Sequence, residues 1–266
     1  MRGRRLIGAV LVAGLVAALT PVASAAAATA SASSSRPAAE AGGDPVIIVA
    51  GTLAGQTLAS VYYEPLAARL RASGYDVTIF GLPGSGLGDI GAISQNLNQK
   101  ADQVRARTGA ARVDLIGHSQ GGLVIRHYLK YRGGANEVDS AISLGAPHYG
   151  AAVANLLTLL GLGSCAGVVA CRQMTIGSPF LAALNAGDDT IGNVSYTNIA
   201  SVNDGIVQPY TTSFLNNDGN NTNVKLQKQC PLRAVGHVGL PLDGMVYSGI
   251  QDALAHRAIT LNCFAL

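Results

Sequence analysis

Short apolar runs alternate with longer, amphipathic segments along most of the chain. The stretch Pro-Val-Ile-Ile-Val-Ala is apolar throughout, as in a central parallel strand that is buried on both faces. Strands are predicted over residues 45–50, 75–80, 113–116, 141–144, 194–200 and 224–227. Helices are predicted over residues 60–72, 94–107, 123–131 and 245–256. Strands that alternate with helices indicate an α/β fold, with a mostly parallel central sheet and helices on both faces.

The sequence Gly-His-Ser-Gln-Gly at residues 117–121 lies between a predicted strand and a predicted helix. A strand, Gly-x-Ser-x-Gly and a helix in that order are typical of a nucleophile elbow. The turn is so tight that a Cβ atom at Gly117 or Gly121 would clash with the flanking elements. Ser119 is therefore predicted to be a nucleophile, and a nucleophilic serine requires a histidine, an acid and an oxyanion hole elsewhere.

The beginning of the chain has the pattern of a secretory signal peptide. Three arginines precede an uncharged run of 14 residues, and an Ala-Ser-Ala site follows. The run is too short for a membrane span, which needs about 20 residues. We expect residues 1–25 to be the signal peptide, with cleavage after Ala25 or alternatively after Ala30.

The remainder divides into two parts. Residues 26–43 are rich in alanine and serine and are expected to be a disordered lead, whereas residues 44–266 suit one α/β domain. Removal of the signal lowers Lys+Arg from 18 to 15, against 15 Asp+Glu, so the mature chain is near neutral. We therefore expect a secreted, extracellular protein, monomeric, with no nucleic-acid partner and no transmembrane anchor.

Four cysteines follow the predicted signal, and an even number in an exported chain favours disulfides. Three pairings are possible. We favour Cys165–Cys171, which closes a small loop, and Cys230–Cys263, which ties down the last segment. The alternative is a zinc site, but the chain has no Cys-x-x-Cys spacing and no histidine close to these cysteines in sequence.

Five histidines are candidates for the general base. His237 lies after the last predicted strand and before the last helix, where an enzyme with this elbow carries its base. His148 follows a strand end and is the alternative. His118 is expected to be structural because adjacent residues on an elbow point apart, His127 lies on the elbow helix, and His256 closes the last helix.

The acid must lie between the serine and the histidine, at the carboxyl end of a strand. Asp204 directly follows the strand at residues 194–200 and is predicted to be that acid. Asp139, Asp188 and Asp189 each precede a strand, which is the wrong end. Asp218 lies in an asparagine-rich turn that could instead ligate calcium.

The oxyanion hole requires two N–H donors. One belongs to Gln120, the residue after the nucleophile, and the other comes from the loop after the first strand, where Thr52 stands. The Thr52 hydroxyl is a possible third donor. This chemistry needs neither a metal nor an organic cofactor, so none is expected.

Three separated motifs resemble those of secreted α/β-hydrolase lipases. They are Ala-Gly-Thr at residues 50–52, Gly-His-Ser-Gln-Gly-Gly at residues 117–122 and Asp-Gly-Ile-Val-Gln-Pro at residues 204–209. The chain is similar over most of its length to exported class 2 lipases of actinobacteria and to the lipases related to Candida antarctica lipase B. The resemblance implies that Ser119, Asp204 and His237 form a triad. It also implies that Thr52 and Gln120 form the oxyanion hole, and that Cys230 and Cys263 form a final disulfide.

The chain departs from that family at His118, where the yeast lipase has tryptophan, and at His148, where it has an acidic residue. Residues 151–187 also differ, and substrate preference depends on such a region. This stretch has one charged residue, Arg172, among many leucines and valines. It is either an ordinary buried helical insert or an apolar wall or lid that meets a lipid or polyester surface.

These features predict a secreted serine esterase or lipase that hydrolyses water-insoluble carboxylic esters through an acyl-enzyme. Ile206, Val207 and Leu240 are expected to line the acyl side. Alternatives are a polyester depolymerase or cutinase-like hydrolase, an acyltransferase, and a catalytically inactive hydrolase fold that only binds. Activity is expected to fall in acid because an imidazole accepts a proton only when neutral.

Overall fold

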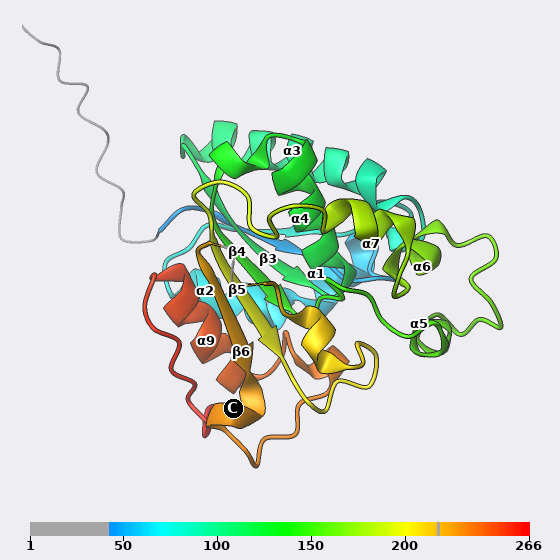
Figure 1. Ribbon diagram of the computed structural model, residues 1–266. Coiled ribbons are helices and arrows are strands. Elements are labelled where there is room, and N and C mark those ends of the chain that lie inside the picture. Colours follow the sequence, from blue (N-terminus) through cyan, green and yellow to red (C-terminus); the bar gives the residue numbers. More distant parts are fainter. Residues whose placement is uncertain (1–42, 217–218) are drawn as a thin grey trace, which may run out of the picture. The chain divides into compact units, whose positions relative to one another are not determined.

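The computed structural model describes residues 43–216 and 219–266 (Figure 1). The predicted signal peptide, nearly all of the predicted lead and Asp218 lie outside these residues. Within the described ranges, no helix is both long and apolar enough to cross a membrane.

The strands form one parallel sheet in the order β2-β1-β3-β4-β5-β6. Their bounds are β1 Val46–Val49, β2 Val77–Phe80, β3 Val113–His118, β4 Val138–Leu144, β5 Ser195–Ala200 and β6 Asn221–Lys225. The α-helices are α1 Gln56–Tyr62, α2 Glu64–Ala72, α3 Ile90–Thr108, α4 Gln120–Tyr131, α5 Val153–Leu160, α6 Val169–Met174, α7 Pro179–Leu184, α8 Leu226–Gln229 and α9 Gly244–Leu254. Short 3₁₀ helices are η1 Pro83–Gly86, η2 Gly134–Asn136, η3 Tyr210–Ser213 and η4 His237–Gly239.

The sheet is covered on both faces, as the alternating pattern predicts (Figure 1). Helices α3 and α4 lie on one face, and α2 and α9 lie on the other. The strand order reverses between β1 and β3, so the connections that leave these two neighbours run to opposite faces. Ligands of open parallel sheets bind at such a switch point, beyond the carboxyl ends of the strands.

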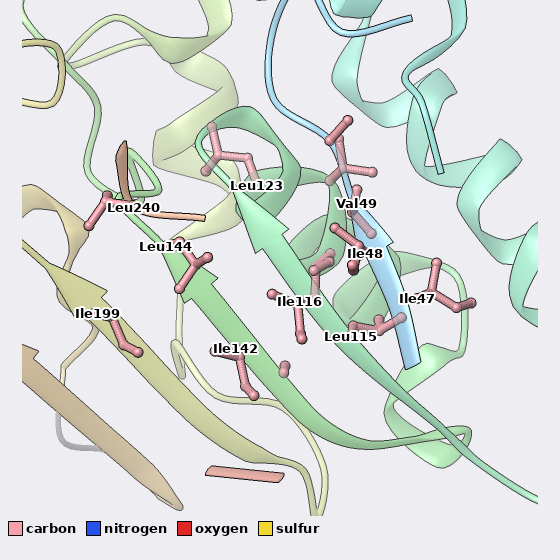
Figure 2. Close-up of a cluster of buried hydrophobic side chains, with 14 of the residues drawn as sticks. Ile47, Ile48, Val49, Leu115, Ile116, Leu123, Ile142, Leu144, Ile199 and Leu240 are labelled. Atoms are coloured by element: carbon pink, nitrogen blue, oxygen red, sulfur yellow. The ribbon is translucent and has the colours of Figure 1, made fainter. Parts of the chain in front are cut away.

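The central strands are buried because both of their faces are covered. Figure 2 shows aliphatic side chains from β1, β3, β4 and β5 in one apolar cluster. Ile47, Leu115 and Ile116 have no solvent exposure. Burying each such side chain stabilises the fold by roughly 1.5–3 kcal/mol, so this layer holds the ends of β1 and β3 in fixed register.

Several element boundaries differ from those predicted. The segment predicted as one helix over residues 60–72 is two helices, α1 and α2, which meet at Tyr63. Pro65 at the second position of α2 lacks an N–H and cannot continue a helix from α1. Helix α3 begins earlier than predicted because the Asp89 carboxylate accepts a hydrogen bond from the Ala92 N–H at 2.7 Å. The last strand is Asn221–Lys225 rather than residues 224–227.

Both predicted disulfides are present. Cys165 and Cys171 close the loop between α5 and α6, and Cys230 and Cys263 join the end of α8 to the C-terminal segment. The described part of the chain contains no free cysteine.

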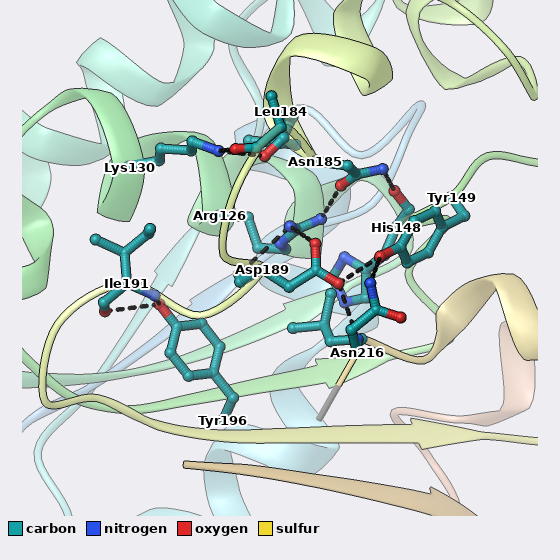
Figure 3. Close-up of polar contacts among 12 residues, drawn as sticks. Arg126, Lys130, His148, Tyr149, Leu184, Asn185, Asp189, Ile191, Tyr196 and Asn216 are labelled. Carbon is teal, nitrogen blue, oxygen red and sulfur yellow. Dashed lines mark hydrogen bonds and ion pairs between the residues drawn. The ribbon is translucent and has the colours of Figure 1, made fainter. Parts of the chain in front are cut away.

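A buried polar network joins the helix after the elbow to the end of the insert (Figure 3). The Arg126 guanidinium on α4 pairs with the Asp189 carboxylate at 3.0 Å and donates to the Asn185 side chain at 2.7 Å. Burial lowers the pKa of Arg126, and the carboxylate of Asp189 opposes that change. Asp189 also accepts hydrogen bonds from the Tyr149 hydroxyl and the Asn216 N–H. Such a pair holds its neighbours in place, because a buried charge without its partner is strongly destabilising.

One buried carboxyl lies at the other end of the sheet. Asp114 on β3 is 2% exposed and accepts a hydrogen bond from the Ser140 N–H at 2.9 Å. Burial raises the pKa of Asp114 to about 8, and the negative charges of Asp139 and Asp44 add to the effect. The native state therefore holds a proton here that the unfolded chain releases at a much lower pH.

Stability should therefore fall as pH rises between the ordinary aspartate pKa of about 4 and the folded value of about 8. Asp114→Asn keeps the acceptor for Ser140 and cannot ionise, so its Tm should depend less on pH across this window. Thermal unfolding followed by circular dichroism from pH 4 to 9 measures both slopes. Asp102→Asn on the surface is the control, and parallel curves for the wild type and Asp114→Asn would contradict the protonated carboxyl.

Candidate active site

Ser119 lies at a strained turn between β3 and α4. Its φ of 55° and ψ of −124° are outside the regions that non-glycine residues ordinarily adopt. A Cβ atom on Gly117 would lie 2.7 Å from the carbonyl carbon of Gly121, and one on Gly121 would lie 2.3 Å from the carbonyl oxygen of Val49. The glycines are therefore required by contact with the backbone, and this contact keeps the serine in its strained conformation.

Three predicted site residues meet in one hydrogen-bonded series. The Nε2 atom of His237 lies 2.9 Å from the Ser119 Oγ, and its Nδ1 atom lies 2.7 Å from an Asp204 carboxylate oxygen. Asp204 follows β5 and His237 begins η4, so each comes from a loop beyond the carboxyl end of the sheet. All three side chains are buried.

The surroundings of Asp204 orient the imidazole. One carboxylate oxygen accepts the N–H groups of Ile206 and Val207, each at 2.8 Å, and the other oxygen faces His237. A carboxylate can only accept there, so His237 carries its proton on Nδ1. The Nε2 atom is then left as an acceptor for the Ser119 hydroxyl. This is the tautomer that a general base for serine requires.

The two predicted oxyanion-hole residues are also brought together. The Thr52 hydroxyl donates to the Gln120 side-chain oxygen at 2.8 Å, and the Gln120 amide donates to the Gly86 carbonyl at 2.8 Å. Among the described residues, neither backbone N–H of Thr52 and Gln120 has an acceptor. Both N–H groups can therefore receive a developing negative charge.

A cavity of about 200 Å³ opens beside Ser119 and His237. Its wall is mainly apolar and is formed by Leu53, Leu58, Tyr62, Leu159 and Val238, together with the loop around Thr52. The predicted acyl-side residues Ile206, Val207 and Leu240 do not line this cavity. Val207 and Leu240 are instead packed in the core, at 1% and 0% exposure.

The insert over residues 151–187 was predicted to be either a buried helical insert or an apolar wall or lid, and it has features of both. Leu159 on α5 lines the cavity, as a wall would. Leu156, Leu181 and Leu184 are buried, as in an ordinary helical insert. The amphipathic α5 thus packs one side into the protein and places one leucine against the site.

His118 is closer to His237 than the sequence indicates. Its ring lines the cavity, its Nε2 atom lies 3.0 Å from the His237 carbonyl oxygen, and its Nδ1 atom lies 2.8 Å from the Tyr63 hydroxyl. Burial lowers the pKa of His118 to about 3, and the nearby His237 adds to the effect. The sequence indicates only that the His118 side chain points away from that of Ser119. Its contact with the loop of His237 could not be predicted, because no local pattern relates residues more than one hundred positions apart.

The other candidate residues lie away from this cavity. His148 contacts the Ser143 hydroxyl and the Asn198 side chain, and burial holds its pKa well below the usual range. Its carbonyl accepts a hydrogen bond from the Asn185 side chain (Figure 3). His127 contacts Ser94. His256 pairs with Asp139 on the surface.

The remaining acids are also elsewhere, since Asp189 is bound to Arg126 and Asp188 is exposed. Within the described ranges, no group of three histidine, cysteine or acidic side chains is arranged to hold a metal ion.

Sequence relatives share part of this chain. Residues 44–161 match the family profile of the alpha/beta hydrolase fold. A triacylglycerol lipase of Vibrio cholerae is 32% identical over 114 residues, which are 42% of this chain and 35% of that enzyme. A triacylglycerol lipase of Pseudarthrobacter phenanthrenivorans is 35% identical over 117 residues, which are 42% of this chain and 36% of that enzyme. The matches thus span little more than a third of these relatives.

Solved structures match over more of the chain. Lipase B of Aspergillus fumigatus superposes with a TM-score of 0.69 at 23% identity, covering 82% of this chain and 54% of that one. The mature lipase BlEst2 of Bacillus licheniformis superposes with a TM-score of 0.60 at 18% identity, covering 76% of this chain and 88% of that one. With the parallel sheet and its strand–serine–helix turn, these matches show that the chain has the α/β-hydrolase fold.

Proposed function

We propose that this protein is a secreted serine hydrolase, a lipase or carboxylesterase that cleaves water-insoluble carboxylic esters through an acyl-enzyme. The observation that carries the proposal is the Ser119–His237–Asp204 hydrogen-bond series beside an apolar cavity. The triacylglycerol lipases that match the chain favour this chemistry. The two disulfides and the predicted signal peptide favour an oxidising, extracellular location.

The reaction follows from the positions of these groups. His237 takes the proton of Ser119, whose oxygen attacks the ester carbonyl, and Asp204 stabilises the imidazolium. The N–H groups of Thr52 and Gln120 bind the negatively charged oxygen of the tetrahedral intermediate. His237 then protonates the leaving alcohol, which departs as the acyl-enzyme forms. Water attacks the acyl-enzyme by the same steps and releases the carboxylic acid.

The mouth of the cavity favours substrates in an aggregate. Leu53, Leu58 and Val238 line the cavity and are 40%, 55% and 62% exposed, respectively. Exposed apolar groups that surround an opening gain by contact with lipid, because that contact removes them from water. A long acyl ester presented by a droplet or membrane therefore suits this opening better than a charged, soluble metabolite does.

Replacing the nucleophile tests the chemistry itself. Ser119→Ala should lower kcat for p-nitrophenyl butyrate by roughly 10⁴–10⁶-fold, because the alanine has no oxygen to form the acyl-enzyme. Mass spectrometry after treatment with a fluorophosphonate should show one adduct, on Ser119, in the wild type and none in the variant. A wild-type protein that neither reacts with the probe nor hydrolyses esters would favour the inactive binding module.

Replacing the acid tests the tautomer argument. In Asp204→Asn the retained side-chain oxygen can still accept from Ile206 and Val207, and the new amide would face His237. The amide can only donate, so the histidine proton moves to Nε2, and kcat should fall by about 10⁴-fold. Thermal unfolding should change little. A kcat within tenfold of the wild type would be inconsistent with this role of Asp204.

The substrate class is tested at the mouth. Leu58→Ser should reduce hydrolysis of emulsified tributyrin several-fold and leave soluble p-nitrophenyl acetate nearly unchanged, because it alters only the apolar contact with the aggregate. Phe264→Ser is the matched control, since Phe264 is 92% exposed and does not line the cavity. A pH-stat assay on both esters, with a polyester film in parallel, measures the preference. A wild type that cleaves acetate and leaves tributyrin and the film untouched would exclude water-insoluble substrates.

A further inference from the structure

Two adjacent tyrosines at the end of α1 are linked to the loop that carries His237. The Tyr62 hydroxyl donates to the Val238 carbonyl, and the Tyr63 hydroxyl contacts His118, whose other nitrogen faces the His237 carbonyl. Two consecutive carbonyl groups of η4 are therefore held by side chains from elements more than one hundred residues away. Neither tyrosine belongs to the hydrogen-bond series that carries the proposed reaction.

The hydrogen bonds that join Gly51, Tyr63, His118 and the His237 carbonyl form one linkage. The groups at its two ends determine where its protons lie. The His237 carbonyl can only accept, so His118 carries its proton on Nε2 and presents Nδ1 as an acceptor. The Tyr63 hydroxyl must then donate to Nδ1, and it accepts the N–H of Gly51 at 2.8 Å. The linkage runs in one direction from Gly51, in the loop that carries Thr52, to the loop of the proposed base. His118 is neutral in this arrangement, which agrees with its burial and lowered pKa.

Apart from the bonds of the His237 ring to Asp204 and Ser119, the hydrogen bonds of this loop are mostly local. Element η4 is only three residues long, and its internal bonds are Gly239 N–H to the Gly236 carbonyl and Leu240 N–H to the His237 carbonyl. Val238, in the middle, is largely exposed. The ring of His118 lies against that of His237, with the centroids 5.0 Å apart. The hydrogen bonds from Tyr62 and His118 therefore hold two carbonyl groups of η4 from outside the loop.

We propose that His118 is a positioning residue whose two ring nitrogens hold the loop of the general base against the oxyanion loop, and that the Tyr62 hydroxyl supports the same loop. The inference rests on the proposed function, because it assigns a role in the placement of His237. Misplacing a reacting group by about 1 Å can cost about 100-fold in rate. Loss of the linkage should consequently lower kcat and change substrate binding much less.

Three variants separate this role from simple packing. His118→Phe keeps a ring and removes both hydrogen bonds, and kcat for p-nitrophenyl butyrate should fall by about 10- to 100-fold with KM changed by less than about threefold. His118→Gln restores a donor near the position of Nε2 and should recover most of this loss. Tyr62→Phe removes one hydroxyl from a half-buried side chain and should lower kcat by about three- to tenfold.

His127→Phe is the matched control. His127 is a histidine of α4 that contacts Ser94 and Phe180, outside the cavity. Its replacement should leave kcat close to the wild-type value if the proposal is correct, even where His127→Phe and His118→Phe lower Tm equally. Equal kcat losses in His118→Phe and His127→Phe would overturn the positioning role, and so would a kcat of His118→Gln no higher than that of His118→Phe.

Nuclear magnetic resonance tests the linkage without relying on turnover. Long-range ¹H–¹⁵N spectra of the wild type should show His118 as the neutral Nε2–H tautomer, and the His237 ring signals should broaden or split in Tyr62→Phe and His118→Phe but not in His127→Phe. An Nδ1–H tautomer at His118, or unchanged His237 signals in both variants, would overturn the inference. Failure of the wild type to hydrolyse esters or react with fluorophosphonate would instead count against the proposed function, and these spectra would still decide on the linkage.

Discussion

The site depends on the close approach of the elbow backbone to the strands beside it. Gly121 lies so near the Val49 carbonyl that even one added carbon would not fit. A Cβ atom on Gly122 would likewise lie only 2.4 Å from the Ala146 Cβ atom. The strained backbone of Ser119 costs on the order of 1–3 kcal/mol. Burial of the Val46–Val49 strand alone offsets that cost, since each large aliphatic side chain contributes roughly 1.5–3 kcal/mol. The apolar core therefore holds the serine where an isolated turn could not.

The reversal in strand order explains why the functional groups converge. The loops after β1 and β3 leave toward opposite faces of the sheet, and the space between them receives the loops that carry Asp204 and His237. Each side chain is then oriented by its own neighbours. Backbone N–H groups orient the carboxylate, and the carboxylate orients the imidazole. His118 and Tyr63 add a second connection, between the loops on either side of the serine.

Local patterns predicted the elements well where burial was continuous and less well where it was not. The strand Val46–Val49 was found because both of its faces are apolar. The edge strand Asn221–Lys225 has a polar sequence, and its bounds are set by pairing with β5, from Tyr196 opposite Asn221 onward. The proline two residues after Tyr63 is the local signal for the break between α1 and α2. Ile206, Val207 and Leu240 do not line the cavity as predicted. Val207 and Leu240 lie in the core instead, because apolar character does not distinguish a wall from a core.

Patterns along the chain were enough to predict the fold class, the elbow and the residues that meet there, because the order of strands and the glycine requirements are local and directional. The distances among Ser119, Asp204 and His237, the shape of the cavity and the contact of His118 with the loop of His237 depend on packing in three dimensions. These properties join segments more than one hundred positions apart in the chain. Spacing along a sequence does not specify how such segments pack. The buried sheet holds them so that their side chains lie within hydrogen-bond distance.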